Sequence, residues 1–290
     1  MTKWIIALAV LLCGPGPEED YAALTASEAA KRRQREEEIR AAHQALDDGR
    51  YEKAVELAKH ARQLEEEIGR IRADARVCLR NLLAELVAKL DHDEFQVREA
   101  ASAKLRELGT LAQPGLVRHR LKAASPECRY RLDELLQGVS VDGDGRIHQW
   151  AADATASSEY TPTDWSAKQV TGAPDTLQGG DARTAWAARE ADGGTEWLRL
   201  TYLFSVRISR LRIHENYVPG GVVAVDVVGT DGTRRRAWEG ADPGGAAPVW
   251  FDVDLQGAVG REVVIVLDTK KNGGWEEIDA VELIGELLED

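Results

Sequence analysis

The pattern of apolar and polar positions changes once along the chain, close to residues 139–141. From about Tyr21 to Leu136, Ala, Glu, Lys, Arg and Leu dominate, and apolar residues recur at helical spacing. Beyond this point the period becomes 2, and short apolar runs are separated by turn residues. The pattern therefore predicts a multidomain α and β protein, with α-helical hairpins followed by an antiparallel β-sandwich.

The second half contains seven strand-like runs with no helical stretch between them. The apolar residues Val249, Phe251 and Val253 alternate with polar neighbours, which is typical of a half-buried antiparallel strand. Turn pairs such as Asp231-Gly232 lie between runs, as hairpins require. Short strands at this spacing indicate a β-sandwich. The runs are Trp197 to Phe204, Ser209 to Glu215, Val222 to Val228, Arg235 to Glu239, Val249 to Leu255, Glu262 to Asp268 and Glu277 to Ile284.

Residues 18–90 are predicted to form a helical hairpin. A turn at Asp47-Asp48-Gly49 separates two helical stretches, and Ala54, Ala58 and Ala61 then put small side chains on one helix face. This spacing resembles the second helix of a tetratricopeptide repeat. Such repeats stabilise one another by stacking, so a single copy favours an ordinary helical hairpin over a tetratricopeptide unit.

Residues 91–140 resemble a HEAT-type helical repeat. Asp93 is expected to cap the first helix, Gly109 to end it, and Ser125-Pro126 to begin the last one. The positions that match the repeat are Val97-Arg98, Ala101 and Pro114. Solenoid helices of this kind usually present a surface to another protein, so the segment favours scaffolding over chemistry.

Residues 1–17 have the composition of a signal peptide. Lys3 precedes an apolar run that is too short to span a bilayer, and Gly14-Pro15-Gly16-Pro17 ends it. Cys13 also resembles the cysteine of a bacterial lipoprotein box, although Leu12 stands where that box has a small residue. We therefore expect export to the periplasm, cell envelope or exterior, with membrane attachment only if Cys13 carries lipid.

Charge narrows the choice of partner. The formal net charge is −13, and residues 141–290 hold 26 acidic and 14 basic side chains, whereas residues 1–140 hold 24 and 23. An acidic domain repels phosphate backbones and anionic lipid headgroups, so nucleic acid and membrane surfaces are poor candidates. Cations and neutral polar ligands remain compatible with this charge.

Catalytic and redox motifs do not emerge from the sequence. The chain contains no His-Glu-x-x-His, no Gly-x-Ser-x-Gly and no Cys-x-x-Cys motif. Cys78 and Cys128 lie at helical apolar positions, where a cysteine usually packs as a small core residue, and a disulfide between them stays open. We therefore expect a non-catalytic protein.

The second half resembles a known family in several ordered blocks. Together they are similar to a discoidin-like, galactose-binding-like jelly-roll domain over residues 141–290. This fold hosts sugar, phospholipid and protein binders, and the resemblance implies a binding module whose ligand lies in loops at one end of the sandwich. The blocks are Ala156-Ser157-Ser158-Glu159-Tyr160, Trp165-Ser166-Ala167, Gly172-Ala173-Pro174, Thr184-Ala185-Trp186-Ala187, Glu196-Trp197-Leu198, Pro219-Gly220 and Glu277-Ile278-Asp279-Ala280-Val281.

The candidate ligand-binding residues are the loop residues that suit a sugar. Aromatic rings stack on sugar rings, and carboxylate, amide and guanidinium groups hydrogen-bond hydroxyls. Trp186 and Trp197 fall in blocks expected to pack in the core, and burial is also the favoured interpretation of Trp165. The candidates are Asp181, Arg183, Glu215, Asn216, Tyr217, Asn272 and Trp275.

Asp279 is a carboxylate in phase with Val281 and Leu283, which are core positions of the last strand. It is expected either to be buried and satisfied by backbone N–H groups or to ligate a structural Ca²⁺, as the equivalent acid does in some related sugar-binding modules.

The sequence thus predicts an exported, non-catalytic protein that recognises carbohydrate through loops of the sandwich. Its partner would be a glycan or an extracellular or envelope protein. The alternative is a protein-protein adaptor, in which the helices bind the partner and the sandwich is structural.

Overall fold

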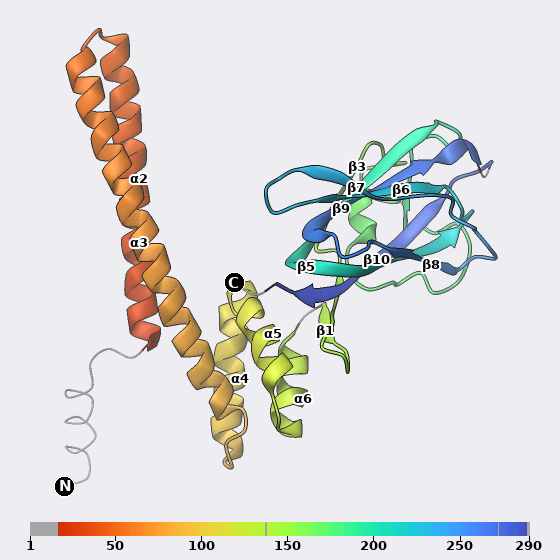
Figure 1. The fold of residues 1–290 in the computed structure, drawn as a ribbon, viewed down its shortest axis with the longest axis horizontal. Coiled ribbons are helices and arrows are strands. Elements are labelled where there is room, and N and C mark those ends of the chain that lie inside the picture. The colour runs from red at the N-terminus through yellow and green to blue at the C-terminus, as the bar shows by residue number, and fades with distance from the viewer. Residues whose placement is uncertain (1–16, 137, 272, 289–290) are drawn as a thin grey trace. The chain divides into compact units, whose positions relative to one another are not determined.

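The computed structural model describes residues 17–136, 138–271 and 273–288 (Figure 1). The chain divides into two compact units. Of the described residues, the first unit holds 17–119 and 123–131, and the second holds 120–122 and those from 132 to 288. The predicted signal peptide and Cys13 lie outside the described residues, apart from Pro17, which begins the first helix.

A long helical hairpin forms most of the first unit. Helix α2 (Pro17–Asp47) and helix α3 (Tyr51–Lys89) are joined by a turn in which Gly49 has a φ of 71°. Ion pairs such as Arg72 with Glu28 link the two helices, and Ala54 and Ala61 are buried. Helix α3 alone has 39 residues, whereas a whole tetratricopeptide unit has about 34, so the structure favours an ordinary hairpin.

Shorter helices follow the hairpin. Gly109, with a φ of 53°, ends α4 as expected, and Ser125 Oγ accepts a hydrogen bond from the Cys128 backbone N–H at the start of α6. Asp93 does not cap α4, because the helix begins one residue later, with Glu94 at the N-cap position and no side-chain hydrogen bond there. The helices are confirmed, but their resemblance to a HEAT repeat is not. They are α4 (Phe95–Leu108), the 3₁₀ turn η1 (Gly109–Leu111), α5 (Gln113–Lys122) and α6 (Pro126–Leu135).

The second unit is an antiparallel β-sandwich, as the sequence predicts. One sheet has the order β3, β5, β9, β6, β7, and the other has the order β8, β5, β10, β2, β1, with β4 paired to the start of β10. The strands are β1 (Val139–Val141), β2 (Ile147–Trp150), β3 (Asp153–Ala156), β4 (Trp186–Ala187), β5 (Thr195–Tyr217), β6 (Val222–Val228), β7 (Arg234–Glu239), β8 (Val249–Asp254), β9 (Val259–Asp268) and β10 (Glu277–Leu287). The 3₁₀ turns are η2 (Ala167–Val170) and η3 (Thr269–Lys271).

Strand β5 belongs to both sheets. Its first part, residues 195–201, pairs with β3 and β9, and its later part, residues 206–217, pairs with β10. The sequence pattern predicts two separate strands here, because Ser205 and Arg207 interrupt the apolar run. The structure instead keeps one strand of 23 residues, with a shift of register against β9 between Thr201 and Val206.

The core lies between these sheets. Buried apolar side chains alternate along β5, and β10 is buried over most of its length. The largest core side chains of the sandwich include Trp186, Tyr202, Leu198, Leu200, Ile208 and Leu211.

In the helical part, Cys78 and Cys128 are free thiols, and burial raises the pKa of the Cys128 thiol. No helix of the described part of the chain is long and apolar enough to cross a membrane.

The segment Asp142-Gly143-Asp144-Gly145 is a turn. Asp142 Oδ1 accepts hydrogen bonds from the backbone N–H groups of Asp144 and Arg146, at 2.9 and 2.8 Å. The carboxylate thus closes its own turn, as Asx turns do.

Candidate functional site at the loop end of the sandwich

Strand pairing brings three loops together at one end of the sandwich. The last residue of β5, Tyr217, pairs with the first residue of β10, Glu277. The loop after β5, the loop before β10 and the long connection of residues 157–185 therefore meet there. Gly180, from the long connection, and Asn216, near the end of β5, are joined by hydrogen bonds in both directions.

Glu277 holds this end together. Its Oε2 accepts hydrogen bonds from the Ala182 backbone N–H at 2.9 Å and from Asn216 Nδ2 at 2.8 Å, and its Oε1 accepts one from Trp165 Nε1 at 3.1 Å. Burial and, to a lesser extent, the neighbouring carboxylate of Asp181 raise the pKa of Glu277 to about 7, against the opposing effect of the hydrogen bonds from Ala182 and Asn216. Glu277 is thus a positioning residue for the loops.

An aromatic cluster of Tyr160, Trp165 and Trp275 lies beside Glu277, to which Trp165 is hydrogen-bonded. The ring of Tyr160 packs edge to face against Trp165, at 5.3 Å between centroids, and against Trp275, at 5.7 Å. Tyr160 is 48% exposed and Trp275 is 40% exposed, so the rings form part of the surface. Trp165 is half-buried with a φ of 52°, and its Nε1 also donates to Asp181 Oδ1 at 3.1 Å.

The candidate residues fall into two groups. Asp181, Arg183, Tyr217 and Trp275 are exposed near this end, whereas Glu215 and Asn216 are fully buried. Asn272 lies outside the described residues.

Sequence reasoning did not select Tyr160, Trp165 or Glu277 as site residues. Tyr160 and Trp165 lie in loops within the family-like blocks, which is the signal that could have found them. Trp186 is fully buried and its Nε1 donates to Ser158 O, which confirms it as a core residue, while Trp197 is only half-buried.

Asp279 is buried, as one of the two interpretations of this residue expects. Its carboxylate accepts hydrogen bonds from the backbone N–H groups of Asp175 and Thr176, and it lies 2.9 Å from His214 Nδ1. Burial alone would raise the pKa of Asp279, but the hydrogen bonds from His214 and Thr176 outweigh it and hold the pKa below its usual value.

The strand alternation that placed Asp279 in phase with the core does not hold at this residue. Ile278 pairs with Glu215 and Ala280 pairs with His214, so Asp279 is an extra residue of β10 opposite a single step of β5. Such a bulge turns the side chain out of the regular alternation. Whether Asp279 ligates Ca²⁺ stays a prediction.

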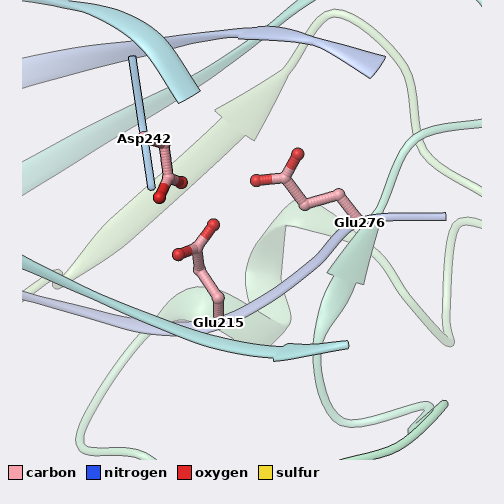
Figure 2. Close-up of side chains that lie close together, drawn as sticks. All are labelled: Glu215, Asp242 and Glu276. Carbon is pink, nitrogen blue, oxygen red and sulfur yellow. The ribbon is translucent and has the colours of Figure 1, made fainter. Parts of the chain in front are cut away.

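A second group of side chains lies beside the Glu277 network. Glu215 lies in β5, Asp242 lies in the loop between β7 and β8, and Glu276 immediately precedes β10 (Figure 2). One carboxylate oxygen of each lies within 4.8 Å of the others, and all three residues are buried. Only the fold reveals this group, because all three residues are far apart in sequence.

These carboxyl groups disfavour one another's ionisation. Burial first, and then the neighbouring Glu276 and Asp242, raise the pKa of Glu215 to about 11. Burial likewise raises the pKa of Glu276 to about 7. Three acids so close together in a buried place must therefore share protons or a cation.

Comparison with solved structures finds matches over the C-terminal half. A chitosan-binding module of a Paenibacillus chitosanase/glucanase is 16% identical, with a TM-score of 0.35, over 46% of this chain and 94% of that one. The family 32 carbohydrate-binding module of Clostridium perfringens NanJ, solved with galactose, is 14% identical, with a TM-score of 0.37, over 48% and 99%. A fucolectin from striped bass is 14% identical, with a TM-score of 0.36, over 49% and 50%.

No curated protein matches the chain. One family model does match, and it spans residues 140–288, which is more than half of the chain and corresponds to the β-sandwich described above. The chain therefore belongs to the family described as the C-terminal SD scarf domain of pappalysin-1.

Proposed function

We propose that the sandwich is a non-catalytic carbohydrate-binding module whose ligand lies on the aromatic cluster. The observation that carries this proposal is the exposure of Tyr160 and Trp275 in one cluster with Trp165, at a loop end fastened by Glu277. Neighbouring exposed aromatic rings on a fixed support are typical of a ligand-binding surface, and sugar rings offer the matching apolar face.

Polar groups beside the rings supply hydrogen bonds. Asp181 lies at the edge of Trp165 and its carboxylate can accept bonds from sugar hydroxyls, while exposed Arg183 can donate to them. The net charge of −13 disfavours strongly anionic polymers, so neutral or amino sugars suit this surface. Tyr217, 36% exposed, extends the same end.

The test is glycan binding by the full chain. A glycan array should identify neutral or amino-sugar ligands, and isothermal titration should then give a Kd that worsens about tenfold or more in Trp275→Ala and Tyr160→Ala. Tyr51→Ala is the matched control, because Tyr51 is 69% exposed on the helical hairpin and should not affect binding. No binding to any glycan, or equal loss in the control, contradicts the proposal.

A second candidate function is protein binding by the helical hairpin. An apolar groove of about 540 Å³ lies along α2 and α3 and includes Ile39, Leu46 and Val55, of which Leu46 is 47% and Val55 is 53% exposed. Such a face suits an apolar helix of a partner. If Leu46→Glu abolishes partner capture while Trp275→Ala does not, the adaptor function is favoured.

We also propose export, which the composition of residues 1–17 supports. Mass spectrometry of the mature N-terminus in a bacterial host distinguishes the cases. Cleavage near residue 17 indicates a soluble secreted form, and a lipid mass on Cys13 indicates membrane attachment.

A further inference from the structure

Four buried carboxylate oxygens at the loop end have no hydrogen-bond partner. They are Glu215 Oε2, Asp242 Oδ2 and both oxygens of Glu276. The exposed fractions of these residues are 0% for Glu215, 9% for Asp242 and 3% for Glu276. Buried polar atoms almost always have partners, so oxygens that are left over in one place indicate a missing ligand.

The remaining carboxylate oxygens are already held by the backbone. Glu215 Oε1 accepts a hydrogen bond from the Gly220 N–H at 3.3 Å, and Asp242 Oδ1 accepts one from the Gly244 N–H at 2.8 Å. Each of these two carboxylates is thereby oriented with its free oxygen available. Figure 2 shows the three carboxylates turned toward one another.

Glycine makes room for this arrangement. A Cβ on Gly221 would lie 1.7 Å from Glu276 Oε2, so any larger residue would displace that carboxylate. Gly221 does not have a positive φ, so its backbone conformation does not require glycine. Glycine is needed there because a side chain would occupy the place of the Glu276 carboxylate.

No basic side chain neutralises the three acids. Among the described residues, none of them forms an ion pair with Lys, Arg or His. Lys271 acts on Glu276 only through space. Several buried negative charges without counterions are very unfavourable, so a proton or a cation must balance them.

The donor set selects the kind of cation. All the free donors are carboxylate oxygens, which suit hard cations rather than Zn²⁺ or Cu²⁺. Three oxygens at the 4.8 Å limit lie about 2.8 Å from their common centre, so a contraction of a few tenths of an ångström brings them to the distance of about 2.3–2.6 Å that Ca²⁺ ligands have. Mg²⁺, which requires about 2.1 Å, would need a larger contraction.

We propose that Glu215, Asp242 and Glu276 bind one Ca²⁺ ion at the loop end of the sandwich. The ion would join the end of β5, the loop between β7 and β8, and the segment that carries Trp275. This site differs from Asp279, whose two oxygens already have donors. The burial of the three acids also argues against a glycosidase pair, which must face its substrate.

The experiment uses the full chain, freed of metal by chelator, and CaCl₂ alone as the probe. Isothermal titration should show one site with a Kd of about 1 mM or tighter, and about 10 mM Ca²⁺ should raise the Tm of the sandwich by at least about 2 °C. Both effects should disappear in Glu276→Gln and in Glu215→Gln. They should persist in Glu239→Gln, a control that removes the same charge at an exposed position.

Removal of one acid should also relieve repulsion in the metal-free protein. Without Ca²⁺, Glu276→Gln is therefore expected to unfold at a higher temperature than the unmodified chain, so its loss of Ca²⁺ response cannot reflect misfolding. If Glu276→Gln does not fold, Asp242→Asn serves the same purpose. No Ca²⁺ binding by the unmodified chain would show that protons alone neutralise the group, and binding that survives all three substitutions would place the ion elsewhere. Either result overturns the proposal.

Discussion

The side chain of Trp165 both hydrogen-bonds the buried carboxylate of Glu277 and forms part of the aromatic cluster at the surface. Its Nε1 donates to Asp181 and Glu277, while its ring packs against Tyr160. Its φ of 52° is unusual for a bulky residue and is maintained by the contacts around it. The residue therefore links the buried carboxylate of Glu277 to the exposed aromatic cluster.

Trp165→Phe should weaken this link while keeping an aromatic ring. Glu277 would lose one of three hydrogen bonds in a buried place, and the free energy of unfolding should fall by about 1–2 kcal/mol. Urea denaturation measures the change. An unchanged midpoint would show that the indole N–H contributes nothing to the support.

Asp226, on β6, gives a pH dependence whose sign the structure determines. Burial alone would raise the pKa of Asp226, but hydrogen bonds from Arg236 and Arg234 on β7 outweigh it and hold the pKa below 3.8. A carboxylate with a lowered folded-state pKa stabilises the protein above its unfolded pKa, and this stabilisation is lost as pH falls through the folded value.

Asp226→Asn should therefore be less stable than the unmodified chain at pH 7, and the difference should shrink below about pH 3.8. Thermal unfolding between pH 7 and pH 3 measures it. Asp252→Asn, a more exposed acid paired with Arg210 and Arg212, should show a smaller difference throughout. A difference in Asp226→Asn that is constant with pH would contradict the ion-pair account.

At the scale of elements, β5 and β10 organise the sandwich. Strand β5 runs through both sheets, and β10 pairs with it along nearly all of its length. Their approach is close at Gly285, where a Cβ would lie 2.4 Å from the Arg207 backbone O. Because backbone cannot move aside as a flexible side chain can, this pairing requires glycine.

Gly285→Ala should destabilise the sandwich by about 1–3 kcal/mol. Gly69 in α3 is the matched control, since nothing lies within 4 Å of the added Cβ and alanine favours the helix by about 0.5–1 kcal/mol. The two substitutions are thus expected to have opposite signs in denaturant unfolding. Equal effects would show that the local contact at Gly285 is relaxed in solution.

At the scale of the whole molecule, the two units differ in charge. Residues 141–290 carry 26 acidic and 14 basic side chains, whereas the first 140 residues are nearly balanced and form many ion pairs along α2 and α3. Salt screens the repulsion between like charges in residues 141–290, and it screens the attraction within the ion pairs of α2 and α3.

Raising NaCl from low to about 0.5 M should therefore raise the Tm of the sandwich and lower that of the helical hairpin or leave it unchanged. Circular dichroism at a helical wavelength follows the hairpin. Tryptophan fluorescence follows the sandwich, which holds seven of the eight tryptophans. A parallel response of both signals would mean that net charge does not govern the stability of the sandwich.

The sequence by itself determined the element types and most strand positions, because side-chain period and turn residues act locally. Val222–Val228 is found as predicted, and β7, β8 and β9 agree to within a few residues. The turn at Gly49 was also readable, since it depends on neighbours in the chain, and the burial of Trp186 followed from the family resemblance of its block.

The tertiary structure alone decided which polar residues meet. The continuity of β5, the bulge at Asp279 and the full burial of Glu215 and Asn216 depend on strand pairing across the sheets. Asp242 joins Glu215 and Glu276 only because the loop between β7 and β8 folds back on the end of β5. Contacts between residues far apart in sequence leave no local period, so the carboxylate group could not be read from the sequence. For the aromatic cluster, the family-like blocks pointed to Tyr160 and Trp165, but their packing with Trp275 depends on the fold.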